Sequence, residues 1–216
     1  MRSKVALFSV FNKDEIFLNF AKKLFETKQW ALLGSKGTSD YLNKNGVGCV
    51  DVADIIGEPI LGHRVVTLSR EIHAGLLATD SAEDRAELER LEILPIDLVY
   101  VDLYPLEEAI KSTEGLSPQE SIKRVIEQTD IGGPAILRSA AKGRRIVLSS
   151  KSQLSDFLSR EKDLKWLYEI ESRPDYEDWI GSLAGAAEKV VAHYAKISGD
   201  FHENMSSYLA YARNKK

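Results

Sequence analysis

The sequence predicts an α/β domain built on a doubly wound, mainly parallel sheet, followed by a helical carboxyl-terminal region. Up to residue 150, short apolar runs alternate with amphipathic segments of helical spacing, and this alternation is typical of a parallel sheet. Beyond residue 150 only helical segments follow, and no repeat or low-complexity linker interrupts the chain. We therefore expect a single domain over residues 1–216. Its α/β core spans 1–150, and a helical extension at 151–216 packs on the core or on a partner subunit.

The first third of the chain alternates strands and helices. Residues 4–10 are apolar and partly β-branched, as expected of a buried strand. Helical spacing of Phe17, Phe20 and Leu24 predicts a helix over residues 14–28, and a short helix over 38–44 is stopped near Gly46. Further strands are expected at residues 30–34 and 48–52. Residues 54–62 show no clear period and contain a proline, so an ordered loop is expected there.

The remaining core segments follow the same alternation. The small residues of 67–78 leave that segment without an assignment. A central strand is expected at residues 97–103, ended by Tyr104-Pro105, and the last strand is expected at residues 145–149. The expected core helices are residues 82–91, 118–128 and 134–142, the last with proline in its first turn. The expected extension helices are residues 153–160, 176–196 and 203–212, joined by polar segments at 171–175 and 198–202.

Composition narrows the classes of partner. A formal net charge of −4 argues against a protein that grips nucleic acid, which needs a basic surface. The single cysteine, Cys49, excludes an intrachain disulfide and a cysteine-rich metal site, and it is expected in a buried strand. The first residues are typical of a strand rather than a signal peptide, and no apolar run approaches membrane-spanning length. We expect a cytoplasmic protein with a small-molecule partner and no metal.

Two polar turns follow the first two expected strands. Ser35-Lys36-Gly37-Thr38 opens a helix, where free backbone donors, hydroxyls and a lysine favour an anion. The turn after the first strand adds Ser9, Asn12 and Lys13, and neighbouring turns of a doubly wound sheet lie side by side. The alternative is an ordinary turn with Ser or Thr as helix cap. Together the two turns predict a phosphate site.

Two later segments carry further candidates. Arg64 and Thr67 lie in the Gly62–Thr67 turn, where Arg64 either chelates a phosphate or a carbonyl or is a surface residue. In Thr129–Gly133, two glycines before a Pro-initiated helix allow close backbone approach and leave amide donors outward. Asp130 is either a base or a helix cap. His73 is expected to have a structural role. No second histidine or carboxylate stands at metal-ligand spacing from it, so a metal site is not expected there.

Taken in order, these segments resemble the IMP cyclohydrolase domain of the bifunctional last enzyme of purine biosynthesis. The resemblance runs from about residue 5 to residue 149 and is carried by six segments. They are SVFNK (9–13), GSKGT (34–38), GHRVVTL (62–68), IHAGLLA (72–78), PIDLVYVDLYP (95–105) and TDIGGPAILRSAAK (129–142). The resemblance implies the methylglyoxal-synthase-like fold, a homodimer, and no cofactor.

The resemblance also implies a reaction and residue roles. The reaction is closure of the formylated aminoimidazole carboxamide ribonucleotide (FAICAR) to inosine monophosphate (IMP) with loss of water. The implied catalytic residues are Lys142, Asp130, Tyr104 and Thr67, with Lys142 donating to the departing oxygen. The implied substrate-binding residues are Ser9, Asn12, Lys13, Ser35, Lys36, Gly37, Thr38, Arg64, Val66, Ile131, Gly132 and Gly133.

The chain departs from the family pattern at two positions. Val66 stands where the family motif GGRVKTLHP has a lysine, and Asp102 replaces an asparagine before Leu-Tyr-Pro. Losing one oxyanion donor costs on the order of 3 kcal/mol of transition-state stabilisation. Lys36 or His63 are candidates to restore the charge, Lys36 being the better one. Val66 keeps open a non-catalytic purine-nucleotide sensor on the same fold, and methylglyoxal synthase is the weaker alternative.

Overall fold

A five-stranded, all-parallel sheet forms the centre of the protein. The computed structural model describes residues 3–62, 64–159 and 174–213. The strands lie in the order β3-β2-β1-β4-β5. Their bounds are β1 (Lys4–Val10), β2 (Trp30–Gly34), β3 (Val50–Asp51), β4 (Leu98–Asp102) and β5 (Ile146–Leu148). The predicted doubly wound parallel sheet is confirmed, with a third strand shorter than expected.

The connections of the central strand, β1, determine where a ligand can bind at the edge of the sheet. It pairs with β2 on one side and with β4 on the other, where Val10 lies opposite Asp102. The chain leaves β1 toward β2 and returns across the sheet to β4, so the turns that follow β1 and β4 diverge. This switch point is where open α/β sheets bind ligands, beyond the carboxyl ends of the strands.

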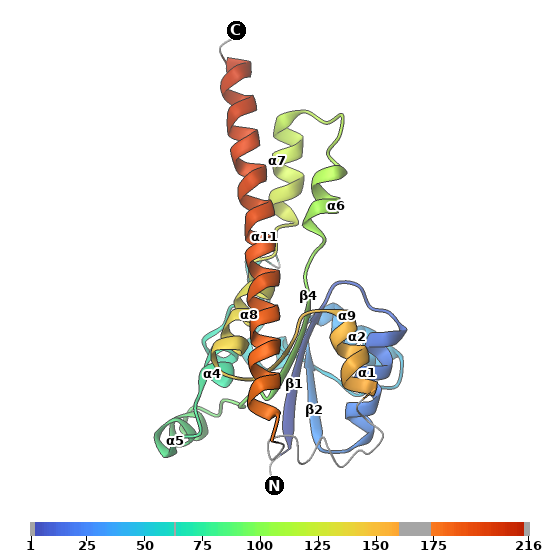
Figure 1. Ribbon diagram of the computed structural model, residues 1–216, viewed down its shortest axis with the longest axis vertical. Coiled ribbons are helices and arrows are strands. Elements are labelled where there is room, and N and C mark those ends of the chain that lie inside the picture. The colour runs from blue at the N-terminus through green and yellow to red at the C-terminus, as the bar shows by residue number, and fades with distance from the viewer. Residues whose placement is uncertain (1–2, 63, 160–173, 214–216) are drawn as a thin grey trace.

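Helices cover both faces of the sheet (Figure 1). One face carries α1 (Glu15–Glu26), α2 (Lys36–Lys44) and α9 (Lys151–Ser159), and the other carries α4 (Arg70–Leu77), α8 (Gly132–Lys142) and α11 (Tyr176–Arg213). The remaining helices are α3 (Ala53–Ile56), α5 (Ala82–Arg90), α6 (Leu106–Lys111) and α7 (Pro118–Glu127). None of the helices in the described part of the chain is long and apolar enough to cross a membrane.

The helices differ from the expectations in several details. The short helix α3 (Ala53–Ile56) overlaps the segment 54–62 that was expected to be a loop, α4 lies in the unassigned segment 67–78, and α6 had no predicted counterpart. The two helices expected at 176–196 and 203–212 are one helix, α11, because the polar joint at 198–202 continues the helix and buries Phe201. Both α2 and α8 begin two residues earlier than predicted, inside their polar turns.

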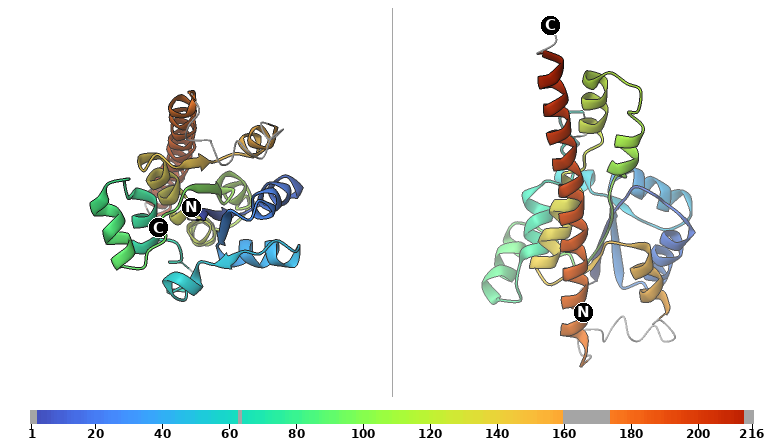
Figure 2. Two further views of the ribbon diagram at one scale, coloured as in Figure 1. Left: turned by 90° about the horizontal axis from the view of Figure 1, so that it is seen from below. Right: turned by 45° about the horizontal axis from the view of Figure 1, so that its top comes forward.

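The long helix α11 packs on the core along its first half. Ile180, Leu183 and Ala187 are buried with the strands in the main hydrophobic cluster. Beyond the sheet edge, α11 runs beside α6 and α7 (Figures 1 and 2). There a small second cluster is formed by Leu106, Val125, Tyr194 and Phe201, which we call the satellite cluster. This cluster fixes three helices above the carboxyl edge of the sheet.

Candidate active site

A cavity of about 610 Å³ opens at the carboxyl edge of the sheet, at the predicted switch point. The turns after β1, β2, β3 and β4 contribute to its wall, together with the 59–68 segment and the connection from α7 to α8. Most of the predicted site residues line it: Ser9, Lys13, Ser35, Lys36, Gly37, Arg64, Val66, Thr67, Tyr104, Asp130, Ile131, Gly132 and Gly133. Three predicted residues, Asn12, Thr38 and Lys142, do not.

The amino terminus of α2 forms the donor-rich end of the cavity. Ser35 occupies the cap position, but its side chain makes no capping hydrogen bond and instead lies 3.1 Å from the Thr38 hydroxyl. Ser35 is thus the N-cap residue by position, without the side-chain hydrogen bond of an ordinary cap. Because the first amide groups of a helix lack intrahelical partners, those of Lys36 and Gly37 are left for an acceptor in the cavity.

Lys13 brings a positive charge to the same end. Its ammonium lies 3.8 Å from the point where a side-chain carbon on Gly37 would stand, so the glycine leaves the amine room at the helix end. Burial lowers the pKa of Lys13, and the nearby carboxylate of Asp102 partly offsets this by raising it. A partly desolvated cation beside uncapped amide groups is suited to bind a phosphate.

Thr38 and Asn12 shape this end without lining it. Thr38 is fully buried, and its hydroxyl accepts a hydrogen bond from the Val10 amide at 3.2 Å, which ties the end of β1 to α2. Asn12 is exposed, and its backbone amide donates to the Asp102 carboxylate at 2.7 Å. Thr38 thus ties the end of β1 to α2, and Asn12 ties the turn after β1 to the end of β4.

Asp130 lies at the opposite end of the cavity, in the turn that leads into α8. Its carboxylate accepts the amide of Gly133 at 2.8 Å, and it also accepts the backbone amides of Tyr104 and Gly132. Burial raises the pKa of Asp130 above its ordinary value, while these three donors partly lower it. Asp130 therefore caps α8 and also faces the cavity, so the two interpretations are compatible.

The two glycines of this turn allow close approach rather than outward donation. A side-chain carbon on Gly132 would stand 2.6 Å from the Thr67 hydroxyl, and one on Gly133 would stand 2.5 Å from the Asp130 carboxylate. The expectation of outward amide donors was wrong, because both glycine amides point to Asp130. The glycines bring Thr67 and Asp130 together at one wall.

Thr67 and Val66 lie in a bend that directly follows the isolated bridge between Ile60 and Val65. Thr67 is buried, and its hydroxyl makes no hydrogen bond to another of the described residues, so it is available to a ligand. Val66 is half-buried and packs against the main core. Arg64 is exposed and its Nε donates to the Leu61 carbonyl at 2.8 Å. His63, a candidate for compensating charge, lies outside the described residues.

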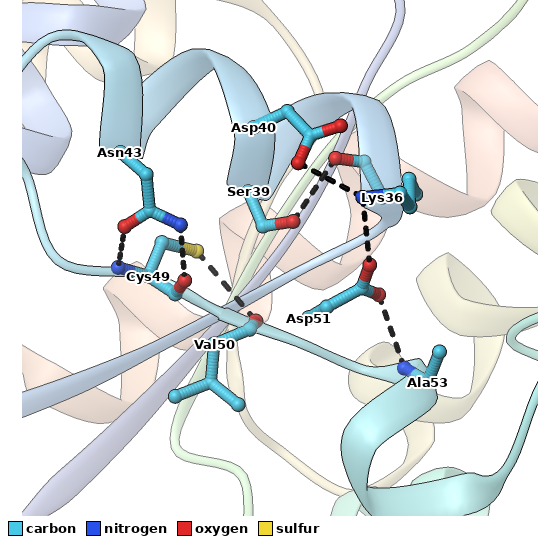
Figure 3. Close-up of polar contacts among 8 residues, drawn as sticks. All are labelled: Lys36, Ser39, Asp40, Asn43, Cys49, Val50, Asp51 and Ala53. Atoms are coloured by element: carbon cyan, nitrogen blue, oxygen red, sulfur yellow. Dashed lines mark hydrogen bonds and ion pairs between the residues drawn. The ribbon is translucent and has the colours of Figure 1, made fainter.

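Lys36, the other candidate for compensating charge, is engaged by carboxylates. Its ammonium lies 3.0 Å from Asp40 and 4.0 Å from Asp51 (Figure 3). The hydrogen bond to Asp40 raises the pKa of Lys36. Figure 3 thus shows an ammonium held between two acidic groups beside α2. The structure gives no support to Lys36 as a substitute for the lysine missing at position 66.

Lys142 lies at the far end of α8 from the cavity. Gly132 and Lys142 are the first and last residues of that helix, about 15 Å apart at the helical rise per residue. Lys142 is exposed and does not line the cavity. The structure therefore does not bring it to Asp130, contrary to the role that the sequence implied.

His73 hydrogen-bonds Ser139 at 2.8 Å, which supports its structural interpretation, and burial lowers its pKa.

Several cavity residues escaped the sequence analysis. Phe11, in the turn after β1, is half exposed and packs its ring 5.1 Å from that of Tyr104, also half exposed. Asp51, Glu127 and Gln128 also line the wall. Of these residues only Phe11 could have been found from the sequence, as an aromatic residue inside a recognised polar turn. Within the described residues no group of His, Cys, Asp and Glu side chains could hold a metal ion.

Comparisons with known proteins agree with the fold. A model of the MGS-like domain family matches residues 17–135. The bifunctional purine biosynthesis protein PurH of Microcystis aeruginosa is 35% identical over 202 residues, covering 91% of this chain and 38% of that protein. PurH of Caldicellulosiruptor bescii is 42% identical over 142 residues, covering 65% of this chain and 26% of that protein. The chain thus spans about a third of the length of these curated relatives. The crystal structure of ForH has a TM-score of 0.75 and 28% identity, covering 93% of this chain and 97% of that one.

Proposed function

The chain belongs to the family of MGS-like domains, and from this premise we propose that it is an IMP cyclohydrolase, which closes FAICAR to IMP. The likeness to PurH, a purine biosynthesis protein, supports a purine nucleotide intermediate as the ligand. The observation that carries the proposal is the cavity itself. It joins a phosphate-binding end to a wall that presents a carboxylate, a hydroxyl and a tyrosine.

Ring closure needs little from an enzyme beyond orientation and charge stabilisation. The carboxamide nitrogen attacks the formyl carbon, forming a C–N bond while the formyl oxygen becomes an oxyanion. The oxyanion takes up a proton, and the resulting hydroxyl then leaves as water together with the proton of the formamide nitrogen. Both groups belong to the same molecule, so the enzyme accelerates the attack by holding them in one plane in a reactive orientation. Donors aimed at the developing oxyanion stabilise the intermediate.

The phosphate of the substrate binds at the donor-rich end. The first-turn amides of α2, the hydroxyls of Ser9 and Ser35 and the ammonium of Lys13 supply its donors. Arg64, on the facing segment, adds a guanidinium to the same ligand. A phosphate fixed here leaves the heterocycle to extend toward the opposite wall of the cavity.

The opposite wall performs the chemistry. Asp130, whose pKa is raised by burial, is a stronger base than an exposed aspartate and accepts the proton of the attacking carboxamide nitrogen. The hydroxyl of Thr67, which has no hydrogen-bond partner among the residues that the structure describes, donates to the oxyanion. Tyr104, paired with Phe11, lies where a planar ring would pass between the two ends.

The direct test supplies FAICAR to the purified chain and follows IMP by absorbance. Formation of IMP at a rate well above the uncatalysed closure supports the proposal. Tight binding of IMP with no turnover would replace it with a nucleotide sensor. Turnover of dihydroxyacetone phosphate instead of FAICAR would assign the chain to methylglyoxal synthase chemistry.

A further inference from the structure

The turn that presents Asp130 is held by a residue 64 positions later in the chain. The backbone amide of Asp130 donates a hydrogen bond to the hydroxyl of Tyr194 at 2.8 Å. Tyr194 lies on α11 and is only 8% exposed. It is absent from the cavity wall, so it reaches the ligand only through the turn.

We propose that Tyr194 is a positioning residue, which fixes the Asp130 turn in its cavity-facing shape and so makes α11 part of the active site. The amide of Asp130 precedes α8 and has no carbonyl partner in that helix. A half-buried amide of this kind needs an acceptor, and the tyrosine hydroxyl supplies it. The part of this inference that concerns turnover rests on the proposed cyclohydrolase function.

The satellite cluster makes the position of this hydroxyl rigid. The Tyr194 ring is buried with Leu106 of α6, Val125 of α7 and Phe201 of α11. One residue earlier, His193 lies 3.3 Å from Glu107, which adds a second link between α11 and α6. Since α6 follows β4 and α7 precedes the Asp130 turn, the cluster ties both flanks of the catalytic wall to one helix.

The shape of the turn controls the basicity of Asp130. The amides of Gly133, Tyr104 and Gly132 reach its carboxylate only in this conformation, and each lowers its pKa. If the turn loosens, donors are lost and the pKa rises further. The titratable groups that face the turn are Tyr104, after β4, and Tyr194, on α11. The charged groups along the rest of the cavity are Lys13, Lys36, Asp51, Arg64, Asp102 and Glu127.

The test is Tyr194→Phe, which keeps the ring in the satellite cluster and removes only the acceptor. We expect the Asp130 amide to exchange its hydrogen about tenfold faster by NMR, as for a neutral hydrogen bond lost. We expect kcat to fall about tenfold with KM for FAICAR within about twofold, because the phosphate end is untouched. The acid limb of the pH profile of kcat should move to higher pH.

Phe201→Leu is the matched control, because it weakens the same cluster without touching Asp130. It should lower the melting temperature while leaving the acid limb and the Asp130 exchange rate in place. An equal shift of the acid limb in Phe201→Leu would assign the effect to packing and overturn the inference. Unchanged exchange and an unchanged limb in Tyr194→Phe would overturn it as well. If the wild-type chain fails to turn FAICAR over, the proposed function fails, and amide exchange alone decides the role of Tyr194.

Discussion

Replacing Asp130 by asparagine separates the charge of this side chain from its shape. The amide oxygen of asparagine still accepts the Gly133 amide, which lies 2.8 Å from the carboxylate in the wild type. The NH₂ group, however, must then face the backbone amides of Tyr104 or Gly132, donors that the carboxylate accepts. The substitution therefore removes the proposed base and also places donor against donor at the start of α8.

The expected losses follow from these contacts. A positioned general base contributes about 100- to 10,000-fold, so kcat should fall by at least about 100-fold. One amide left without an acceptor costs about 1–3 kcal/mol, and a mean of about 2 kcal/mol lowers the melting temperature of a chain this long by about 4–8 °C. Affinity for IMP should change by less than about fivefold, because a phosphate contact at α2 is not altered.

The assay combines FAICAR turnover, IMP titration and thermal melting on the same preparations. Asp102→Asn is the matched control for kcat, because an asparagine oxygen can still accept the Asn12 amide, and the lost charge acts on Lys13 rather than on the proposed base. Its kcat should stay within about threefold of wild type. A kcat for Asp130→Asn within fivefold of wild type, with IMP binding intact, would refute Asp130 as the base.

Three further predictions use the same assays. Val66→Lys should raise kcat about tenfold, which is less than the full effect of an oxyanion donor because a half-buried valine is lost from the core. An unchanged kcat would mean that the oxyanion needs no ammonium at this position. Lys142→Ala should keep kcat within about threefold, since about 15 Å of α8 separates it from the cavity; abolished turnover would contradict a site contained in one chain. Because the pKa of Asp130 is raised, the folded state binds its proton more tightly than the unfolded chain does, so the free energy of unfolding should fall as pH rises from 3.8 through the folded pKa and then level off. Denaturant titration should show that this fall vanishes in Asp130→Asn. A fall of equal size in both proteins would assign the pH dependence to another group.

Local patterns were sufficient to predict most of the sheet. Runs such as residues 4–10 and 30–34 are short, apolar and bounded by polar turns, and both became strands with the expected bounds. The pattern failed where tertiary packing decides the structure. Leu106 and Ala109 are buried in α6, but six residues after a proline show too little period to predict a helix. The polar residues at 198–202 suggested a joint, and only the burial of Phe201 explains why α11 continues through them.

The sequence located cavity-lining residues best where one turn holds all of them. Ser35, Lys36 and Gly37 follow directly from a strand–turn–helix pattern, and the structure places them at the cavity. The role of Lys142 stays a prediction: the family motif implied it, and within one chain the length of α8 keeps the residue away from the cavity wall. The sequence also missed the use of the glycine amides, because Asp130 reaches back to them only after the turn has folded.

The two ends of the cavity are held by contacts of different kinds: one by neighbouring strands of the sheet, the other by helices far apart in the sequence. The phosphate end is organised by turns that follow adjacent strands, so the sheet alone fixes it once β1 and β2 pair. The catalytic wall brings together Thr67, Tyr104 and Asp130, and its turn is held by α11. Removing the Tyr194 hydroxyl should therefore alter turnover before it alters phosphate binding. Under the proposed function, nucleotide affinity and ring closure are thus expected to be separable, and the long helix α11 is expected to act on ring closure.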